Sequence, residues 1–322
     1  MCPEVQAVDR HTAIERVLER AHTFRGHHVT ASPLSGGHIN NAYVVQVDGD
    51  QRYVVRIPGA SEGSRVVSLD DERHNSVAAA HAGASPRVVE YLEDVGVMVV
   101  DFVVGEALTD ENVGDRARIP RLAAALKRLH AGRPFRADFD MATVARAWLR
   151  VCVERAIPTP EGLSARMDRL DLAARALAAR PMILVPCHND LSADNLIDDG
   201  ERVWLIDLEF SGNNDPCFDL ADIAAQAHLD PSWHVGMCEA YFGRADPVKL
   251  ARMALHATIS GVGWAIWASI MDRTSPRDID FHRYVSAFWE PARGMLDSDA
   301  FDRCLRVVSD GAERRRSKSI SE

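Results

Sequence analysis

A short segment in the middle of the chain combines polar side chains whose types and spacing suit chemistry at a metal. His188, Asp190 and Asn195 occupy the first, third and eighth positions of one motif. A short apolar run then ends at Asp207, and Glu209 lies two residues further along. An aspartate and an asparagine five residues apart in a tight loop can converge on one point, and a hairpin would place Asp207 beside them. Carboxylate and amide oxygens are ligands that Mg²⁺ prefers, so we expect Asn195 and Asp207 to bind a magnesium ion.

A third element follows, in which Asp215-Pro216 precedes Asp219-Leu220. Taken alone, the spacing of His188, Asp190 and Asn195 is as compatible with loop acids on a solvated surface as with a site. The three elements come in order, however, and each follows the local structure that it needs, which favours a site. With Asp190 facing a substrate hydroxyl, the arrangement suits phosphoryl transfer, which requires positioning and charge neutralisation more than covalent chemistry.

A glycine-containing turn lies upstream, before a predicted strand. It comprises Ser35, Gly36 and Gly37, with Asn40 and Asn41 close behind. Such a turn can bring backbone N–H groups against phosphates, although an ordinary turn would have the same composition. No Gly-Lys-Ser/Thr follows it, so it is not a Walker A loop.

Two charged residues downstream of this turn are further candidates for nucleotide binding. Arg56, on the next predicted strand, is placed to reach the α- and β-phosphates, and Glu72 on the following helix would orient it. A surface ion pair is the alternative interpretation of the two residues, and it would be preferred if they stood alone.

The elements that must position these residues fall into two parts of different composition. Up to about residue 103 the chain is rich in β-branched residues, with strands expected at 43–47, 52–57, 87–92 and 95–100. Asp48-Gly49-Asp50 between the first two strands is a hairpin signal. Helices are expected at 12–22 and 69–82. We therefore predict that residues 1–103 form a nucleotide-binding lobe that ends in a hinge.

Beyond residue 103 the chain becomes rich in alanine and leucine. Helices are expected at 121–130, where Leu122, Leu126 and Leu129 share one face, at 141–156, at 163–179, and from 219 to about 308, with short strands between 183 and 206. The most apolar segment, 257–271, is too short to span a bilayer, so we expect a buried helix. We predict a helical catalytic and acceptor-binding lobe over 104–310 and a disordered tail over 311–322.

Amino-acid composition and charge argue against several classes of protein. The 322 residues are 47% hydrophobic and carry a formal net charge of −10, which argues against nucleic acid as a partner and favours encounter with a small cation. The six cysteines show neither metal-ligand nor disulfide-framework spacing, and no secretory signal or membrane segment is apparent. We therefore expect a cytoplasmic protein with reduced thiols; its oligomeric state is left open.

With these motifs together, the chain resembles the choline/ethanolamine kinase branch of the aminoglycoside phosphotransferase superfamily, whose fold is like that of protein kinases. The resemblance runs from about residue 34 to 288 and is strongest over 186–221. It implies an α+β fold of two lobes, with a small antiparallel β-sheet in the N-terminal lobe and a larger, mainly helical C-terminal lobe. ATP and Mg²⁺ are the implied cofactors.

The resemblance also implies roles for individual residues. Asp190 would be the catalytic base, Asn195 and Asp207 would hold Mg²⁺, and Glu209 would be a further acidic residue near the metal and the acceptor. His188 and Asp219 would brace the catalytic loop. The hinge, whose backbone would meet the adenine ring, corresponds to Asp101, Phe102 and Val103.

Two departures from the family pattern are visible. Arg56 stands where the superfamily commonly has lysine, and although arginine keeps the charge, the two side chains are not interchangeable. Only about ten residues separate Asp207 from Asp219, and no protein-kinase activation segment is present, which argues against protein substrates.

Aromatic residues near the C-terminus are candidates for the acceptor site. Trp264 and Trp267 share one side of a predicted helix, and Phe281 and Tyr284 share one side of the next. A quaternary ammonium has no N–H to donate, so aromatic faces are the means of binding it. Aromatics at helical spacing are more often core residues, but the resemblance implies a choline pocket at this place, with Phe281 where the family usually has tyrosine.

Nearby acids would add long-range attraction for a cation. The candidates are Asp207, Glu209 and Asp215.

The sequence therefore predicts a small-molecule kinase with choline as the first-choice acceptor and ethanolamine next. An aminoglycoside kinase is the nearest alternative, although the C-terminal Arg314-Arg315-Arg316 does not suit a polycation. A nucleotide-binding regulatory protein without turnover is the alternative of another class, and Arg56 is the only feature in its favour. A metal-dependent hydrolase built on His188 and Asp190 is more remote, because a second histidine cluster is missing.

Overall fold

The computed structural model describes residues 10–34, 40–59 and 66–319, and the chain divides into two compact units. Unit 1 comprises Met1–Ala60 and Pro86–Val104, and unit 2 comprises Ser61–Ser85 and Gly105–Glu322. The domain bounds expected from the sequence stay a prediction; residues 66–85, which were expected in the first lobe, belong to unit 2. Helix α2 (Leu69–His81) explains the difference, because Ala78 and Ala79 are buried in the hydrophobic core of unit 2.

Unit 1 is built on an antiparallel sheet. In its described part, the strand order is β1-β2-β3-β5-β4, with bounds β1 Val29–Pro33, β2 Asn41–Val47, β3 Gln51–Ile57, β4 Val88–Leu92 and β5 Val97–Asp101. Helix α1 (Arg10–Arg20) packs on one face, where Ile14 and Val17 meet the inward-facing Val45 and Val55. The alternation of buried and exposed residues along β2 is what a sheet with one covered face requires.

The predicted hairpin between β2 and β3 is present. Val47 pairs with Gln51, so the connection is Asp48-Gly49-Asp50. Asp48 has φ 50° and Gly49 has φ 86°. Consecutive left-handed residues favour aspartate or asparagine followed by glycine, which is why this dipeptide marks a tight hairpin.

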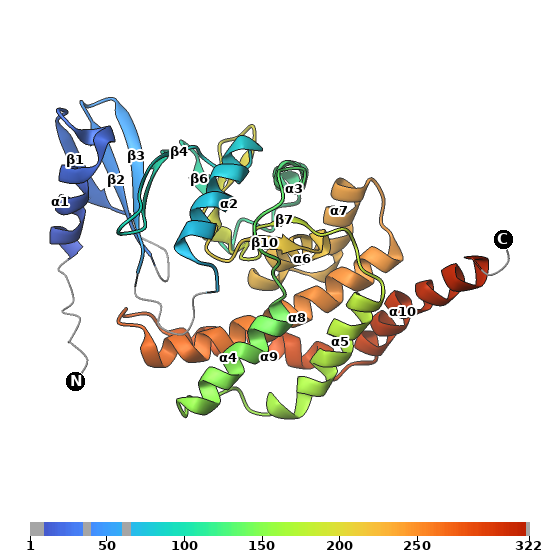
Figure 1. The fold of residues 1–322 in the computed structure, drawn as a ribbon. Helices are drawn as coiled ribbons and strands as arrows, with labels where there is room; N and C mark the ends of the chain where they lie inside the picture. The colour runs from blue at the N-terminus through green and yellow to red at the C-terminus, as the bar shows by residue number, and fades with distance from the viewer. Residues whose placement is uncertain (1–9, 35–39, 60–65, 320–322) are drawn as a thin grey trace. The chain divides into compact units, whose positions relative to one another are not determined.

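Unit 2 is mainly helical (Figure 1). Besides α2, its helices are α3 Ile119–His130, α4 Met141–Glu154, α5 Met167–Ala179, α6 Pro216–Gln226, α7 Pro231–Phe242, α8 Pro247–Thr274, α9 Phe281–Leu296 and α10 Asp299–Ser319. Short strands form two small sheets, β10-β7 and β6-β8-β9, with bounds β6 Glu106–Ala107, β7 Val185–Cys187, β8 Leu196–Asp198, β9 Val203–Leu205 and β10 Gly212–Asn214. As predicted, Leu122, Leu126 and Leu129 of α3 share the buried face of that helix.

Three successive helices of unit 2 begin with the same signal. Helices α6, α7 and α8 each start at a proline that follows an aspartate, namely Asp215, Asp230 and Asp246. Each aspartate accepts a hydrogen bond from a backbone N–H in the first turn, and proline costs nothing at a position whose N–H lacks a helical partner.

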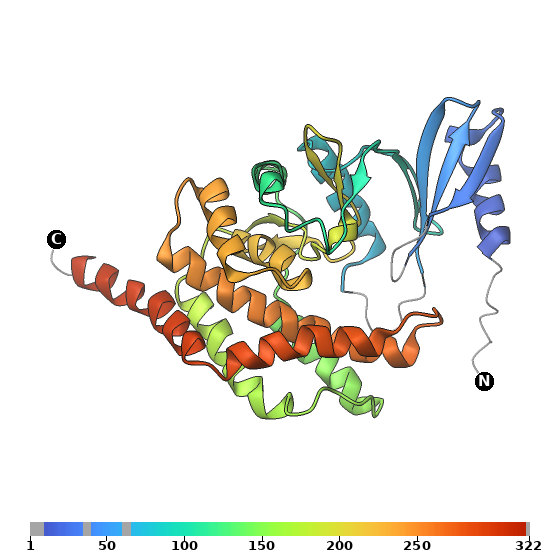
Figure 2. The same cartoon turned by 180° about the vertical axis from the view of Figure 1, so that it is seen from behind.

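Helix α8 passes through the centre of unit 2 and packs against α4, α6 and α9; Figure 2 shows it beside α9 from behind. It is 28 residues long, more than the 257–271 segment expected, and so is long and apolar enough to cross a membrane by length and composition. However, 89% of its most apolar window is buried within the protein, as in the core helix of a soluble protein. Gly261 permits this packing, since a Cβ there would lie 3.1 Å from Ala292 of α9.

The C-terminal segment differs from the expectation of disorder over 311–322. Helix α10 continues to Ser319, and residues 320–322 lie outside the described part of the chain. The helix is anchored by the buried Phe301 and Val308, and the run Arg314-Arg315-Arg316 that follows consists of good helix formers, which propagate a helix once it has begun.

Candidate active site

The backbone of Ile206 connects the segments that carry the predicted site residues. Its N–H donates to the carbonyl oxygen of Asn195 at 3.0 Å, and its own carbonyl accepts from Nε2 of His188 at 2.7 Å. The antiparallel pairing of β8 with β9 sets this register, because Leu196 is opposite Leu205. Asn195 and His188 are thereby fixed next to Ile206, and Asp207 follows it directly. The structure thus brings together the motif residues that the sequence singled out.

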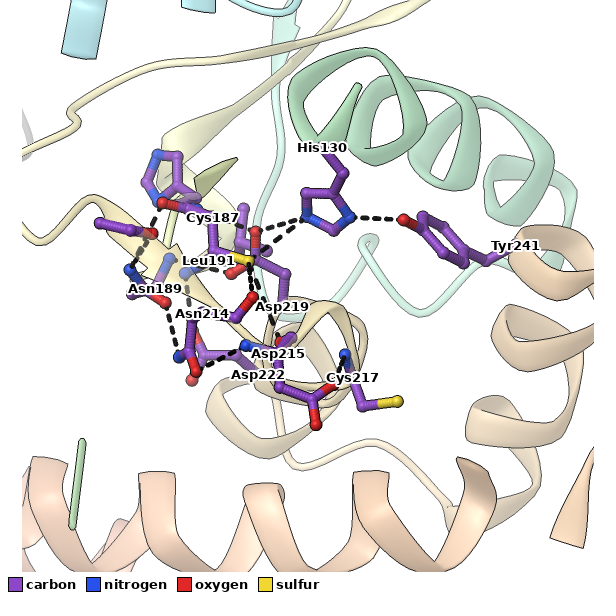
Figure 3. Close-up of polar contacts among 12 residues, drawn as sticks. His130, Cys187, Asn189, Leu191, Asn214, Asp215, Cys217, Asp219, Asp222 and Tyr241 are labelled. Atoms are coloured by element: carbon purple, nitrogen blue, oxygen red, sulfur yellow. Dashed lines mark hydrogen bonds and ion pairs between the residues drawn. The ribbon is translucent and has the colours of Figure 1, made fainter. Parts of the chain in front are cut away.

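Asp219 holds the turn that precedes Asp190. Its Oδ2 accepts from the backbone N–H of His188 at 2.8 Å, and its Oδ1 accepts from the backbone N–H of Asn189 at 2.9 Å. Nε2 of His130, the last residue of α3, lies 3.0 Å from the same Oδ2 (Figure 3). Asp219 is completely buried, and its hydrogen bonds to these donors offset the cost of burying the carboxylate.

Asn189 completes the turn and was not singled out from the sequence. It has φ 65°, a conformation that asparagine tolerates better than most residues. Its Nδ2 contacts the carbonyl oxygens of Cys187, Phe210 and Gly212 at 3.1–3.3 Å. Its Oδ1 accepts from Nδ2 of Asn214 at 2.9 Å. These bonds tie the turn to the paired strands β7 and β10.

Asp190 lies at the centre of the site and contacts two amide side chains. Nδ2 of Asn195 donates to the carbonyl oxygen of Asp190 at 3.0 Å and lies 3.3 Å from its Oδ2. Nε2 of Gln226, at the end of α6, lies 3.0 Å from Oδ1. Asp190 is therefore held from both sides, and each carboxylate oxygen has its own neighbour.

Burial raises the pKa of the Asp190 carboxyl well above its usual range. The hydrogen bond from Gln226 acts in the opposite direction, whereas the negative charges of Asp222, Glu209 and Asp207 raise the pKa further. The site is thus strongly acidic in composition, and a bound cation would relieve the repulsion among its carboxylates.

The donors at the predicted metal site fit Mg²⁺. Because Nδ2 of Asn195 faces Asp190, Oδ1 is the atom of that amide which a metal would take. Asp207 adopts φ 62°, a strained conformation of the kind that collects at functional sites. Glu209 is only partly buried. All three offer hard oxygen ligands, which Mg²⁺ prefers to nitrogen or sulfur.

The residues predicted to bind nucleotide are divided between the two units. Ser35, Gly36 and Gly37 lie outside the described residues. In unit 1, Oδ1 of the buried Asn40 is 3.3 Å from the N–H of Gly59, and Asn41 begins β2. Arg56 lies on β3, between Ala42 of β2 and Met98 of β5. Glu72 is in the first turn of α2 in unit 2 and is almost completely buried.

The predicted hinge lies at the end of β5. Asp101 forms an ion pair with Arg87 at 2.9 Å. The N–H of Phe102 contacts the carbonyl oxygen of Arg52 at 3.3 Å, and the Arg52 guanidinium lies 4.2 Å from the Phe102 ring centre. Val103 follows without secondary structure of its own.

The four predicted acceptor-site aromatics form one continuous series of rings. Centroids are 5.8 Å apart for Trp264 and Trp267, 5.8 Å for Trp267 and Phe281, and 6.3 Å for Phe281 and Tyr284. The first three are less than a tenth exposed, so packing against neighbours accounts for most of their surface. Tyr284 is the most accessible of the four.

Asp222, a buried residue of α6 that the sequence analysis missed, connects these rings to Asp190. It accepts from the indole Nε1 of Trp264 at 3.3 Å, and Gln226, which contacts Asp190, lies 2.9 Å from it. The spacing of Asp219, Asp222 and Gln226 by three and four residues places them on one face of a helix. That periodicity could have identified both missed residues.

Asp215 is the one acidic candidate that cannot attract a cation. It caps α6, is almost fully buried, and lies 2.8 Å from Nε of Arg252 and 3.2 Å from Nε2 of His256. Although burial opposes ionisation, His256 and Arg252 hold the pKa of Asp215 well below its usual range. Its charge is neutralised within the core, so the expectation of long-range attraction was wrong for this residue.

The described residues also include a buried group, His130, Cys187 and Asp219, whose ligand atoms lie within 4.8 Å of one another. Three donors of these types can hold a metal, but here they already have other partners. Nδ1 of His130 contacts the Tyr241 hydroxyl at 2.7 Å, and Asp219 accepts two backbone N–H groups. Burial raises the pKa of the Cys187 thiol well above its usual range, which disfavours the thiolate that a metal needs. The group braces the turn that precedes Asp190.

A family model and individual relatives both show similarity between this chain and phosphotransferases. Residues 30–255 match the model of the phosphotransferase enzyme family (APH). Protein LicA of Haemophilus influenzae is 25% identical over 262 residues, covering 78% of this chain and 76% of that protein. Thiamine kinase of Escherichia coli is 30% identical over 195 residues, covering 60% of this chain and 63% of that enzyme.

The fold is shared with solved structures. A choline/ethanolamine kinase family protein from Mesorhizobium loti is 25% identical, with a TM-score of 0.81 over 93% of this chain and 99% of that one. The kinase-like α+β fold predicted from the sequence is confirmed, with an antiparallel sheet in unit 1 and a mainly helical unit 2.

Proposed function

The chain belongs to the phosphotransferase enzyme family, and from that premise we propose that it transfers the γ-phosphoryl group of ATP to the hydroxyl of a small cationic alcohol. Choline is the first-choice acceptor, giving phosphocholine. The observation that carries the proposal is that the series of rings on α8 and α9 is joined to Asp190 through Asp222 and Gln226. A carboxylate able to take a hydroxyl proton and rings able to bind a cation are thus parts of one connected group.

Asp190 would orient the acceptor hydroxyl and take its proton as the new oxygen–phosphorus bond forms. Asn195 and Asp207 would hold Mg²⁺, with Glu209 nearby. When bound, the ion supplies positive charge that neutralises the phosphate oxygens. His188 and Asp219 would not touch the substrate; they hold the turn in the position from which Asp190 acts.

Nucleotide binding is proposed for the glycine turn around Ser35–Gly37, for Asn40 and Asn41, and for Arg56 with Glu72. The hinge backbone at Asp101–Val103 would meet the adenine. Arg56 offers bidentate phosphate contacts in place of the family lysine, and its planar, always charged guanidinium suits that role.

The rings favour a quaternary ammonium over a primary one. Aromatic faces attract a cation by about 0.5–2 kcal/mol per ring, depending on desolvation, and require no N–H from it. Ethanolamine, whose ammonium can donate hydrogen bonds, would depend more on carboxylates such as Glu209. An aminoglycoside, a larger molecule than choline, is the alternative acceptor. The alternative outside enzymes is a regulatory protein that binds nucleotide without turning it over.

Thiamine is a second candidate acceptor, and the similarity to thiamine kinase favours it. Thiamine shares with choline a hydroxyethyl group and a quaternary nitrogen. Aromatic faces and a proton-accepting carboxylate would therefore suit both molecules.

The test is coupled ADP release with ATP and Mg²⁺ across choline, thiamine, ethanolamine, an aminoglycoside panel and no acceptor. Rapid turnover with choline alone supports the proposal in full. Turnover with thiamine alone keeps the catalytic assignment and changes the acceptor. ATP binding without turnover on any acceptor contradicts the enzymatic proposal.

A further inference from the structure

Gln226 is the last residue of α6, and its amide lies between two carboxylates. Its Nε2 is 3.0 Å from Oδ1 of Asp190 and 2.9 Å from Oδ2 of Asp222. Both contacts are made by Nε2, so the amide donates to an oxygen of each carboxylate, and each of its two N–H groups has one partner. Among the described residues, Gln226 is thus the one side chain that donates a hydrogen bond to both of these aspartates.

Asp222 is a fixed point in this arrangement. It is completely buried, and Figure 3 shows it beside Leu191, the residue after Asp190. Its Oδ2 accepts from the N–H of Leu191 at 2.7 Å, and its Oδ1 accepts from Ser260 Oγ at 2.6 Å and from Trp264 Nε1 at 3.3 Å. With Gln226 the donors number four, which saturates the lone pairs of a carboxylate.

The carboxylates of Asp222 and Asp190 differ in how firmly hydrogen bonds hold them. Asp222 is held by donors from the catalytic loop, α6 and α8, whereas Asp190 is only partly buried and its Oδ1 is held by Gln226 alone among the described contacts. Two like charges so close would move apart if nothing lay between them. The Gln226 amide replaces that repulsion by two hydrogen bonds, and therefore decides which way the Asp190 carboxylate points.

We propose that Gln226 is a positioning residue for the phosphoryl transfer. It fixes Oδ1 of Asp190 against the immobile Asp222 and so leaves Oδ2, next to Asn195, to receive the acceptor hydroxyl. This inference rests on the proposed function, because it assigns Asp190 the role of base. Gln226 itself touches no substrate.

The test compares Gln226→Met with Ser269→Ala in the full-length protein. Methionine keeps the length of the side chain but cannot donate to either aspartate. Ser269→Ala is the control, because it removes a buried hydroxyl of α8 that donates to the carbonyl oxygen of Ala265 in the same helix and is not part of the arrangement of Asp190, Gln226 and Asp222. Steady-state kinetics with the best acceptor are measured for both variants, together with crystal structures of the wild type and Gln226→Met.

In Gln226→Met we expect kcat to fall about tenfold to a hundredfold while KM for ATP changes less than about twofold, since a misplaced group costs rate more than binding. Ser269→Ala should stay within about threefold of the wild-type kcat, because Asp190, Gln226 and Asp222 keep their contacts. Wild-type kcat in Gln226→Met, or an equal loss in Ser269→Ala, would overturn the proposal.

If the wild type turns over no acceptor, the proposed function fails, and the crystal structures still decide this inference. A rotated Asp190 carboxylate in Gln226→Met would support it. An unmoved carboxylate would overturn it.

Discussion

His130 and Asp219 are 89 residues apart in the sequence and share a buried contact of 3.0 Å between Nε2 and Oδ2. Both side chains are almost completely inaccessible to solvent. The same carboxylate accepts the backbone N–H groups of His188 and Asn189, so helix α3 is linked through one residue to the turn before Asp190.

Replacing His130 with Leu should lower the free energy of unfolding by about 1–3 kcal/mol, since it removes one donor from the buried Asp219 carboxylate and the partner of the Tyr241 hydroxyl. Urea denaturation measures the change. His282→Leu, at an exposed position on α9, is the control and should stay within about 0.5 kcal/mol of the wild type. Equal stability of both variants would mean that the His130–Asp219 contact does not brace the turn.

Replacing Asp190 with Ala should lower kcat by at least about a hundredfold, because the acceptor hydroxyl loses its general base. The dissociation constant for ATP, measured by calorimetry, should stay close to that of the wild type. Asp194→Ala is the matched control, since it removes an exposed carboxylate from the same loop and should retain kcat within about threefold. Undiminished turnover in Asp190→Ala would remove this residue from the mechanism.

Replacing Trp267 with Ala should raise KM for choline by about 2- to 30-fold, the equivalent of one cation–π contact, and leave KM for ATP almost unchanged. Trp148→Ala is the control for core damage. Trp148 is equally buried and its ring lies 6.1 Å from that of Trp264, but it is not one of the four acceptor-site rings. If the two variants change both KM values alike, the rings are a core and not an acceptor site.

Asp215 should make stability depend on pH in acid. Its pKa is lower in the folded protein than the unfolded value of about 3.9, so its contribution is fully present above that pH and is lost as pH falls towards the folded pKa. We expect the wild type to exceed Asp215→Asn in free energy of unfolding at pH 7, and this difference to shrink below about pH 4. A difference that grows in acid would contradict the assignment of Asp215 as a buried, ionised partner of Arg252.

Much of the site could be predicted because its residues are close in sequence. His188, Asp190 and Asn195 lie in one loop, and the apolar run before Asp207 had to pair beside it. The hairpin at Asp48-Gly49 was equally local. In each case the chemistry and the backbone conformation are set within a few residues, and a single sequence contains that information.

The parts that were missed depend on partners far along the chain. The role of Asp222 depends on its contacts with Ser260 and Trp264, which lie about forty residues further along the chain on α8. Asp215 was expected to attract a cation, but its charge is neutralised by Arg252, which lies 37 residues further along the chain. Helix α2 was assigned to the wrong unit because the sequence does not show which core receives its alanines. A single sequence does not record pairings between distant elements.

The backbone N–H groups of the loop that contains Asp190 bear on the dynamics of that loop. Those of His188, Asn189 and Leu191 donate to the buried carboxylates of Asp219 and Asp222 on α6, not to backbone carbonyls. Their protons can exchange with solvent only when α6 separates from the loop. The turn and α6 should therefore open as one cooperative unit, with hydrogen–deuterium exchange as slow in this loop as in the helix that holds it.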